Sequence, residues 1–245
     1  MILTDLYTEF LYRPLFNGLM AAYVFLPGRD LGVAIVVLTA VVRLVLHPLF
    51  DRQYHSQRVL SSLQPKVTEI REKIKNQQEQ TKHIMALYQE SGVHPASGCL
   101  PVLIQLPVLF ALYRVLVNGL RPDALSDLYR FLPHPGTIDP IAFGFLNLGT
   151  PNAVLAVAAG VFQYLQSRLI LPPRKARGKV KERDLSAMMN TQALYVMPVV
   201  TVVIALGLPA GLSLYWVATT ILGILQQEFL KRRHGPPATL PATTR

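Results

Sequence analysis

The chain has 245 residues and a formal net charge of +10, which in a soluble protein of this size would suggest nucleic-acid binding. However, 51% of the residues are hydrophobic and only 16% are charged. The hydrophobic residues form long blocks, and about 20 such residues in an α-helix cross the roughly 30 Å hydrocarbon core of a bilayer. Composition therefore excludes an ordinary soluble domain and predicts an all-α integral membrane protein.

Residues 1–30 precede the first long block and are expected to lie outside the cell. They include hydrophobic residues near helical spacing, interrupted by Asp5, Glu9 and Arg13. The first ten residues contain no Lys or Arg, so the positively charged start of a signal peptide is not indicated. We expect an N-terminal helix in the membrane interface, with a sixth spanning helix as the alternative. The hydrophobic residues of this helix are Leu6, Phe10, Leu11, Leu15, Leu19 and Tyr23.

Five hydrophobic blocks have the length of a membrane span, and each is predicted to form one transmembrane helix. They are residues 31–50, 99–117, 153–171, 192–208 and 210–230. The last two are separated only by the turn-forming sequence Gly-Leu-Pro-Ala-Gly at 207–211, which predicts a tight helical hairpin. An odd number of spans places the two chain ends on opposite sides of the membrane.

The distribution of basic residues predicts which side is cytoplasmic. Segments 51–98, 172–191 and 231–245 contain seven, six and four Lys or Arg residues, whereas 1–30 and 118–152 contain two each. By the positive-inside rule the N-terminus is outside and the C-terminus is cytoplasmic. The cytoplasmic tail, residues 231–245, is rich in Pro, Ala and Thr after His234 and is expected to be disordered.

The first cytoplasmic segment, residues 51–98, is predicted to form a helical hairpin. Pro65 is expected in the first turn of one helix, and the second helix is expected to end before Gly92. A narrow hydrophobic stripe follows helical spacing along both helices. Its members are Val67, Ile70, Ile74, Ile84, Leu87 and Tyr88.

Motifs typical of enzymes are not found. The sequence has no His-Glu-x-x-His, Gly-x-Ser-x-Gly or phosphate-binding glycine loop, and its six histidines are scattered. The single cysteine, Cys99, rules out an intrachain disulfide and a two-cysteine metal site. We therefore expect no catalytic residues, no metal, no cofactor and no small-molecule substrate.

Arg43 is the most informative single residue because it interrupts the first predicted span. A guanidinium at the centre of a spanning helix costs roughly 2.5–3.5 kcal/mol, so it should face protein or a water-filled cavity. Thr39 and His47 lie one turn to either side on the same face. Alternatively, the side chain extends to the cytoplasmic surface, roughly 10 Å away. The sequence leaves both interpretations open.

Polar and aromatic side chains in the other spans are candidates for lining a polar cavity with Arg43 and Thr39. Hydrogen bonds between helices are a simpler role for each of them, and an aromatic belt at the membrane surface is a simpler role for the Tyr and Trp. The candidate groove residues in these spans are Gln105, Gln163, Gln166, Ser213, Tyr215 and Trp216.

The basic cytoplasmic loop, residues 172–191, is a candidate contact for ribosomal RNA or another anionic partner. Alternatively, the positive charge of the loop only keeps it on the cytoplasmic side of the membrane. The basic residues are Arg174, Lys175, Arg177, Lys179, Lys181 and Arg183.

Four segments resemble the YidC/Oxa family of membrane-protein insertases, in the family's order and spacing. They are Val-Arg-Leu with His-Pro-Leu (42–49), Leu-Gln-Pro-Lys-Val (63–67) with residues 87–95, Gly-Cys-Leu-Pro-Val-Leu-Ile-Gln-Leu-Pro (98–107), and Met-Pro with Leu-Pro-Ala-Gly-Leu-Ser-Leu-Tyr-Trp (197–216). The resemblance extends from about residue 30 to residue 230. It is closest to short bacterial members that lack a large extracytoplasmic domain.

The resemblance implies a protein of the bacterial plasma (inner) membrane with a hydrophilic groove open to the cytoplasm and to lipid. Such proteins insert hydrophobic segments of nascent proteins without ATP, alone or with the Sec translocon. Arg43 would be the groove arginine, with Gln105 and Trp216 nearby, and residues 52–93 would be a mobile element that receives substrate. A small solute transporter or channel, using Arg43 as an anion site, and a passive assembly scaffold remain alternatives.

Overall fold

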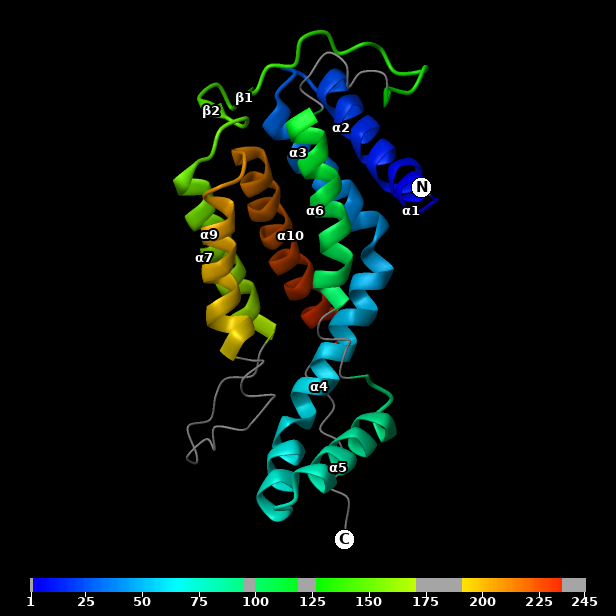
Figure 1. The fold of residues 1–245 in the computed structure, drawn as a ribbon, viewed down its shortest axis with the longest axis vertical. Helices are drawn as coiled ribbons and strands as arrows, with labels where there is room; N and C mark the ends of the chain where they lie inside the picture. Colours follow the sequence, from blue (N-terminus) through cyan, green and yellow to red (C-terminus); the bar gives the residue numbers. More distant parts are fainter. Residues whose placement is uncertain (1, 95–99, 119–126, 171–190, 235–245) are drawn as a thin grey trace.

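The computed structural model describes residues 2–94, 100–118, 127–170 and 191–234, and most of them are helical (Figure 1). The predicted helical fold is therefore confirmed, whereas the number of spans stays a prediction. The elements in chain order are α1 (Ile2–Tyr7), η1 (Thr8–Tyr12), α2 (Arg13–Phe25), α3 (Leu31–Val45), α4 (His47–Lys73), α5 (Gln77–Glu90), α6 (Leu100–Asn118), β1 (Ile141–Ala142), β2 (Leu146–Asn147), α7 (Ala153–Ile170), η4 (Gln192–Val196), α9 (Met197–Ala205) and α10 (Ala210–His234).

The N-terminal segment is one helix with a π-helical turn, η1, between α1 and α2. One face of it packs against α3 and α6, while Leu6 and Phe10 on the other side stay exposed. Burial of this face ties the segment to the rest of the protein through the hydrophobic effect. The buried hydrophobic residues of this segment are Tyr12, Leu15, Phe16, Leu19, Met20 and Tyr23.

The predicted helix over residues 31–50 is wrong at its C-terminal end. Helix α3 ends at Val45, and α4 begins at His47 after a bend of 69° at Leu46. Pro48 explains the bend, because it has no N–H to donate to the carbonyl of Leu44 and its ring would clash with that carbonyl in a continuous helix. In the first turn of a new helix, where Pro48 lies, these penalties do not apply.

Helices α4 and α5 form a hairpin, but Pro65 lies inside α4 rather than at the start of a helix, so that prediction is wrong. The two helices pack through a small cluster of buried residues, Leu63, Val67, Tyr88 and Val93. Burial raises the pKa of the Tyr88 phenol above its usual value. Ile70 and Ile74 are only partly buried, so the contact lies nearer the N-terminal end of α4 than the predicted stripe implied.

The remaining helices surround α10. Helices α7 and α9 lie on one side of it and α3, α6 and the N-terminal helix on the other (Figure 1). Helix α10 packs against both groups, most extensively against α7 and α3. Gly160 allows α7 and α9 to approach closely, since a Cβ at this position would lie 2.9 Å from the carbonyl oxygen of Pro198.

A two-stranded antiparallel pair, β1–β2, lies at the end of the helices opposite the hairpin, and an all-α prediction does not include it (Figure 1). The turn between the strands uses Phe143 and Gly144 at φ values of 54° and 78°. Asp30 fixes this turn to the start of α3, because its two carboxylate oxygens accept from the backbone N–H groups of Val33 and Phe143. The sheet is thereby fastened to the helix core.

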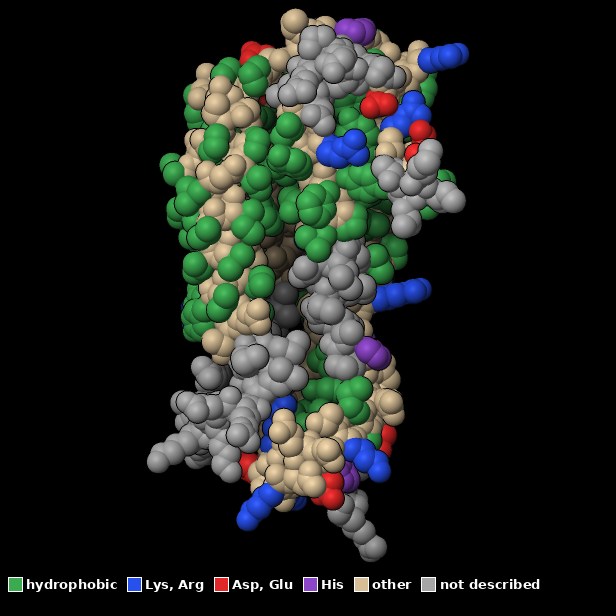
Figure 2. Space-filling model, viewed as in Figure 1, with side chains coloured by type: hydrophobic (Ala, Val, Ile, Leu, Met, Phe, Trp, Pro, Cys, Tyr) green, Lys and Arg blue, Asp and Glu red, His purple; other side chains and the backbone are tan. Residues whose placement is uncertain are grey.

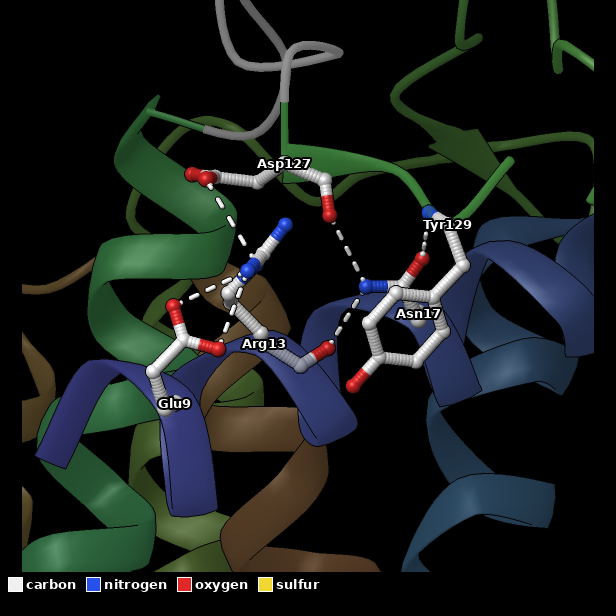
Figure 3. A network of polar contacts seen from close by, with 5 residues as sticks. All are labelled: Glu9, Arg13, Asn17, Asp127 and Tyr129. Atoms are coloured by element: carbon white, nitrogen blue, oxygen red, sulfur yellow. Dashed lines mark hydrogen bonds and ion pairs between the residues drawn. The ribbon is translucent and has the colours of Figure 1, made fainter. Parts of the chain in front are cut away.

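Asn17 binds the loop before the sheet to the N-terminal helix (Figure 3). Its Nδ2 donates to the carbonyl oxygens of Arg13 (2.8 Å) and Asp127 (3.0 Å), and its Oδ1 accepts from the N–H of Tyr129 (2.6 Å). The Arg13 side chain binds the carboxylate of Glu9 at 2.9 Å and lies 3.9 Å from that of Asp127. Asn17 therefore satisfies three backbone groups in a place where only 2% of its surface is exposed.

Among the described residues, no helix taken singly has both the length and the hydropathy required of a membrane span. Helices α3 and α4 meet both requirements as a bent pair. Large hydrophobic side chains are nevertheless exposed along α7 and α9, where they cover much of one side in Figure 2. They include Val154, Val157, Val161, Leu165, Val199 and Val203.

Candidate functional site

A small cavity lined by both polar and hydrophobic side chains lies where α3, the start of α4, α6 and α10 meet. Its volume is about 20 Å³, which is enough for one or two water molecules and too little for a peptide. Next to it, the molecular surface is hollowed between α9 and α6, with α10 behind (Figures 1 and 2). The lining residues of the cavity are Thr39, Val42, Arg43, Leu46, Phe50, Gln105, Val108, Tyr215 and Thr219.

Arg43 extends from the last turn of α3 into this cavity. Its Nη1 donates to Oε1 of Gln226 at 2.6 Å, and its guanidinium carbon lies 4.9 Å from the centre of the Phe50 ring. Among the described residues, no carboxylate lies within 4.0 Å of the guanidinium, and its Nε has no hydrogen-bond partner. Within the described part of the chain, Arg43 thus brings a positive charge without a carboxylate partner next to a cavity large enough for a water molecule.

Gln226 connects Arg43 to His47 across the bend between α3 and α4. Its Nε2 lies 2.8 Å from Nδ1 of His47. A glutamine on α10 therefore fixes the arginine on α3 and the histidine on α4 in one hydrogen-bonded chain.

Tyr215 forms the opposite side of the cavity. Its hydroxyl accepts from Nε2 of Gln105 at 2.5 Å and is hydrogen-bonded to Thr219 one turn further along α10. The Thr39 hydroxyl donates to the carbonyl of Ile35 at 2.6 Å. Hydrogen bonds thus join α6 to α10 at this level, while Thr39 is satisfied within its own helix.

Gly223 lets the guanidinium cross the surface of α10. A Cβ at this position would lie 2.6 Å from Nη2 of Arg43 and would also collide with the amide nitrogen of Gln166. Gln166 from α7 and Arg43 from α3 therefore meet over the same glycine, which makes Gly223 a requirement of the site.

The structure brings together some of the residues that the sequence singled out. Arg43, Thr39, Gln105 and Tyr215 line the cavity, and Gln166 lies beside Arg43 at Gly223. The other three, Gln163, Ser213 and Trp216, do not line the cavity. The six basic residues of the loop at 172–191 and Cys99 lie outside the described residues. The role of all these residues in binding substrate stays a prediction.

Sequence reasoning missed Gln226 and Gly223 and did not choose Thr219. A signal was present, because Tyr215, Thr219, Gly223 and Gln226 repeat at intervals of three or four and so share one face of α10. Two of these are a glycine and a threonine, which are common at ordinary contacts between membrane helices. Their proximity to Arg43 became visible only when α10 was placed beside α3.

Comparison with known proteins identifies the family. Residues 23–236 match the model of the family described as 60Kd inner membrane protein. The chain belongs to this family. Relatives of similar length support the assignment. The chain is 32% identical to "Membrane protein insertase YidC 2" of Bacillus anthracis over 235 residues, which cover 93% of this chain and 82% of that protein.

Two further relatives extend the family relationship. The chain is 32% identical over 205 residues to "Membrane protein insertase YidC" of Fusobacterium nucleatum, which covers 83% of this chain and 87% of that protein. It is also 32% identical over 213 residues to "Membrane protein insertase MisCA" of Bacillus subtilis, covering 84% and 72% of the two chains.

A solved structure of the family also resembles the chain. The crystal structure described as "Active YidC insertase crystal structure with the first transmembrane domain resolved" matches with a TM-score of 0.58 and 26% identity. The match covers 87% of this chain and 45% of that one, so this chain spans less than half of the larger protein. The resemblance in fold supports the family assignment made from sequence.

Proposed function

We propose that this chain is a membrane-protein insertase of the bacterial inner membrane that moves hydrophobic segments of nascent proteins into the bilayer through a polar groove around Arg43. The observation that carries the groove proposal is the position of Arg43, which lies beside a cavity large enough for a water molecule and has no carboxylate partner among the described residues. Family membership supports insertion as the activity.

The proposed mechanism depends on polarity within the membrane. A positive charge in surroundings of low dielectric constant attracts the acidic or polar flank of a client more strongly than it would in bulk water. Gln105, Tyr215 and Thr219 place polar groups in the cavity beside it, and water held there would shorten the hydrocarbon distance that the flank must cross. The cavity itself is too small for a peptide, so the client segment is proposed to lie in the hollow between α6 and α9.

Five membrane spans, with the N-terminus outside and the C-terminus cytoplasmic, are part of this proposal. Helices cover each of the five hydrophobic blocks, and α7 and α9 expose hydrophobic side chains as lipid-facing helices do. In this orientation the α4–α5 hairpin is cytoplasmic, and the β1–β2 sheet with the Asn17 contacts closes the outer end.

Nascent membrane proteins are the proposed clients, and the ribosome and the Sec translocon are further proposed partners. A contact with ribosomal RNA through the six basic residues of loop 172–191 predicts affinity that falls steeply with salt, because phosphate contacts release counter-ions. Binding that survives neutralisation of all six residues would leave the loop a determinant of topology alone.

Reconstitution into liposomes tests the proposed activity. The purified protein is incorporated without other proteins, a short single-span client is synthesised outside, and insertion is scored by protease protection. We expect protection above that of protein-free liposomes and a loss with Arg43→Ala for clients with acidic flanks. Protection equal to protein-free liposomes would contradict the proposal.

The same liposomes separate the alternatives. A transporter or channel that uses Arg43 as an anion site predicts flux of small anions without any client, and an assembly scaffold predicts client binding without protease protection. Neither has a specific observation in its favour. Insertion without anion flux is the result that we expect.

A further inference from the structure

We propose that Gln226 is a positioning residue that presents Arg43 to the cavity, and that neutral His47, protonated on Nε2, fixes the orientation of the Gln226 amide. The proposal rests on the function proposed above. It concerns two side chains that do not line the cavity. The sequence placed His47 on the same helix face as Arg43 but did not indicate Gln226.

The order of donors and acceptors follows from chemistry. A guanidinium has only donors, so the atom of Gln226 that lies 2.6 Å from Nη1 of Arg43 must be its carbonyl oxygen. The amide nitrogen then faces Nδ1 of His47 at 2.8 Å. Because that nitrogen can only donate, Nδ1 must offer a lone pair, and the proton of the neutral ring must lie on Nε2.

Each of the three side chains comes from a different helix. Arg43 is in the last turn of α3, His47 is the first residue of α4, and Gln226 is in α10. The chain of hydrogen bonds therefore spans the bend at Leu46 and fixes the end of α3 to α10. If the amide rotated by 180°, its NH₂ group would face the guanidinium, and two donors would oppose each other.

Gln226 has no charge, and this matters for the groove. A carboxylate at this position would hold the arginine equally well but would neutralise it, leaving no net charge for a client. An amide oxygen fixes the guanidinium and leaves its full positive charge. A glutamine can therefore hold the guanidinium in place without neutralising it, whereas an aspartate or glutamate could not.

The first test is a spectrum recorded without any client. Histidine side-chain nitrogens are labelled with ¹⁵N in the full-length protein in lipid bilayers, and the His47 signals are identified by their loss in His47→Asn. At about pH 8, where histidine side chains are ordinarily neutral, we expect His47 as the Nε2–H tautomer in the wild type. A free neutral imidazole already favours this tautomer, so the sign of the contact is a rise in the Nδ1–H share in Gln226→Leu. A dominant Nδ1–H tautomer in the wild type would overturn the proposal.

The second test measures insertion of two clients that differ only in an acidic or a neutral flank. Gln226→Leu should lower insertion of the acidic client roughly tenfold, the effect of one lost hydrogen bond to a charged group, and should spare the neutral client. Gln227→Leu is the matched control, since it removes the same amide from the next position and should leave insertion unchanged.

Conservative variants separate positioning from simple packing. His47→Asn places a carbonyl oxygen where Nδ1 lies and should retain insertion of the acidic client, whereas His47→Leu should lose it. Gln226→Glu should keep the arginine in place yet lower insertion of the acidic client, because the charge is neutralised. Equal loss for both clients, or wild-type insertion by Gln226→Leu, would overturn the proposal. The spectrum decides the contact even if the chain inserts no client.

Discussion

At the scale of single residues, Arg43 and its neighbour Leu44 test whether the groove is wet. Their side chains leave α3 in different directions, and Leu44 is 73% exposed on the outer surface of the protein. In a membrane, that surface would face lipid, whereas Arg43 faces the cavity. The two positions therefore predict opposite access to water.

We predict that Arg43→Cys reacts with a membrane-impermeant thiol reagent from the cytoplasmic side, whereas Leu44→Cys does not. Both variants carry Cys99→Ser so that the engineered thiol is the only one. Labelling is measured in intact membranes by a mass shift on gels. An unreactive thiol at position 43, or equal labelling at both positions, would contradict a water-filled groove.

The variant Arg43→Lys tests whether insertion depends on the positive charge of Arg43 or on the shape of its guanidinium. A lysine keeps the positive charge but cannot reproduce the planar fork of the guanidinium. We expect it to retain much of the insertion of acidic clients that Arg43→Ala loses. The measurement is protease protection in liposomes, with a neutral-flanked client as the control. Equal loss in the Lys and Ala variants would show that charge is not the decisive property.

Asn17 is the residue on which we expect the outer loop to depend. Asn17→Ala removes three hydrogen bonds to backbone groups. The Arg13 carbonyl keeps its helical partner, but the carbonyl of Asp127 and the N–H of Tyr129 lose theirs, at a cost of about 1–3 kcal/mol for each group that is buried. Trypsin should then cleave faster after Arg130, which is exposed in this loop, and the melting temperature should fall. Asn147→Ala, an exposed asparagine in β2, is the matched control. Unchanged cleavage in Asn17→Ala would contradict this role.

At the scale of elements, the α4–α5 hairpin differs from the helices around α10. The hairpin is held by a small cluster built on Leu63, Val67, Tyr88 and Val93, whereas the main cluster includes residues from most of the other helices. Few buried contacts give a low free energy of local opening. The hairpin is thus built to move more readily than the helices that it joins.

We predict that amide hydrogens of the hairpin, residues 52–93, exchange faster than those of α3, α7 and α10. Hydrogen exchange with mass spectrometry in lipid discs measures this directly. Leu63→Ala should accelerate exchange across both hairpin helices, because its side chain is fully buried between them. Ile74→Ala, at the partly exposed residue that follows α4, is the control and should have little effect. Equal protection in the hairpin and around α10 would contradict the prediction.

At the scale of the whole molecule, the exposed hydrophobic surface distinguishes a membrane protein from a protein in water. Val203 on α9 is 65% exposed, and Met85 on α5 is 37% exposed. In water, a lysine at either position would be tolerated. In the proposed membrane orientation, only the hairpin position faces water.

We predict that Val203→Lys lowers the amount of protein stably inserted in membranes, because a lysine facing hydrocarbon is unfavourable, by at most the roughly 2.5–3.5 kcal/mol found at the centre of a span. Val203→Leu and Met85→Lys should be tolerated. Quantitative blots of washed membranes measure the effect. Wild-type levels of Val203→Lys would contradict a lipid-facing surface on α9.

The sequence predicted the helical class because long hydrophobic blocks and helical periodicity are local properties. It did not predict the bend at Leu46, since Pro48 disfavours a helix interior but suits the first turn of a new helix. Pro65 was misread for the same reason, as it lies within α4 despite being a residue that often starts helices. The β1–β2 pair is only two residues per strand, too short to leave a periodic pattern.

The candidate site, like the fold, was predicted from the sequence only in part. The sequence by itself determined that Arg43 lies within a hydrophobic helix, since the block around it is continuous in the chain. An arginine in such a helix is costly unless it faces protein or water, and this marks the residue as a candidate. Only the tertiary structure decided what Arg43 contacts. Gln226 is 183 residues away in the chain, and its selection as partner depends on the rotation of α10 against α3 and on the space left by Gly223. The spacing along α10 indicates which residues share a face, but only the packing of the helices decides which partner that face meets.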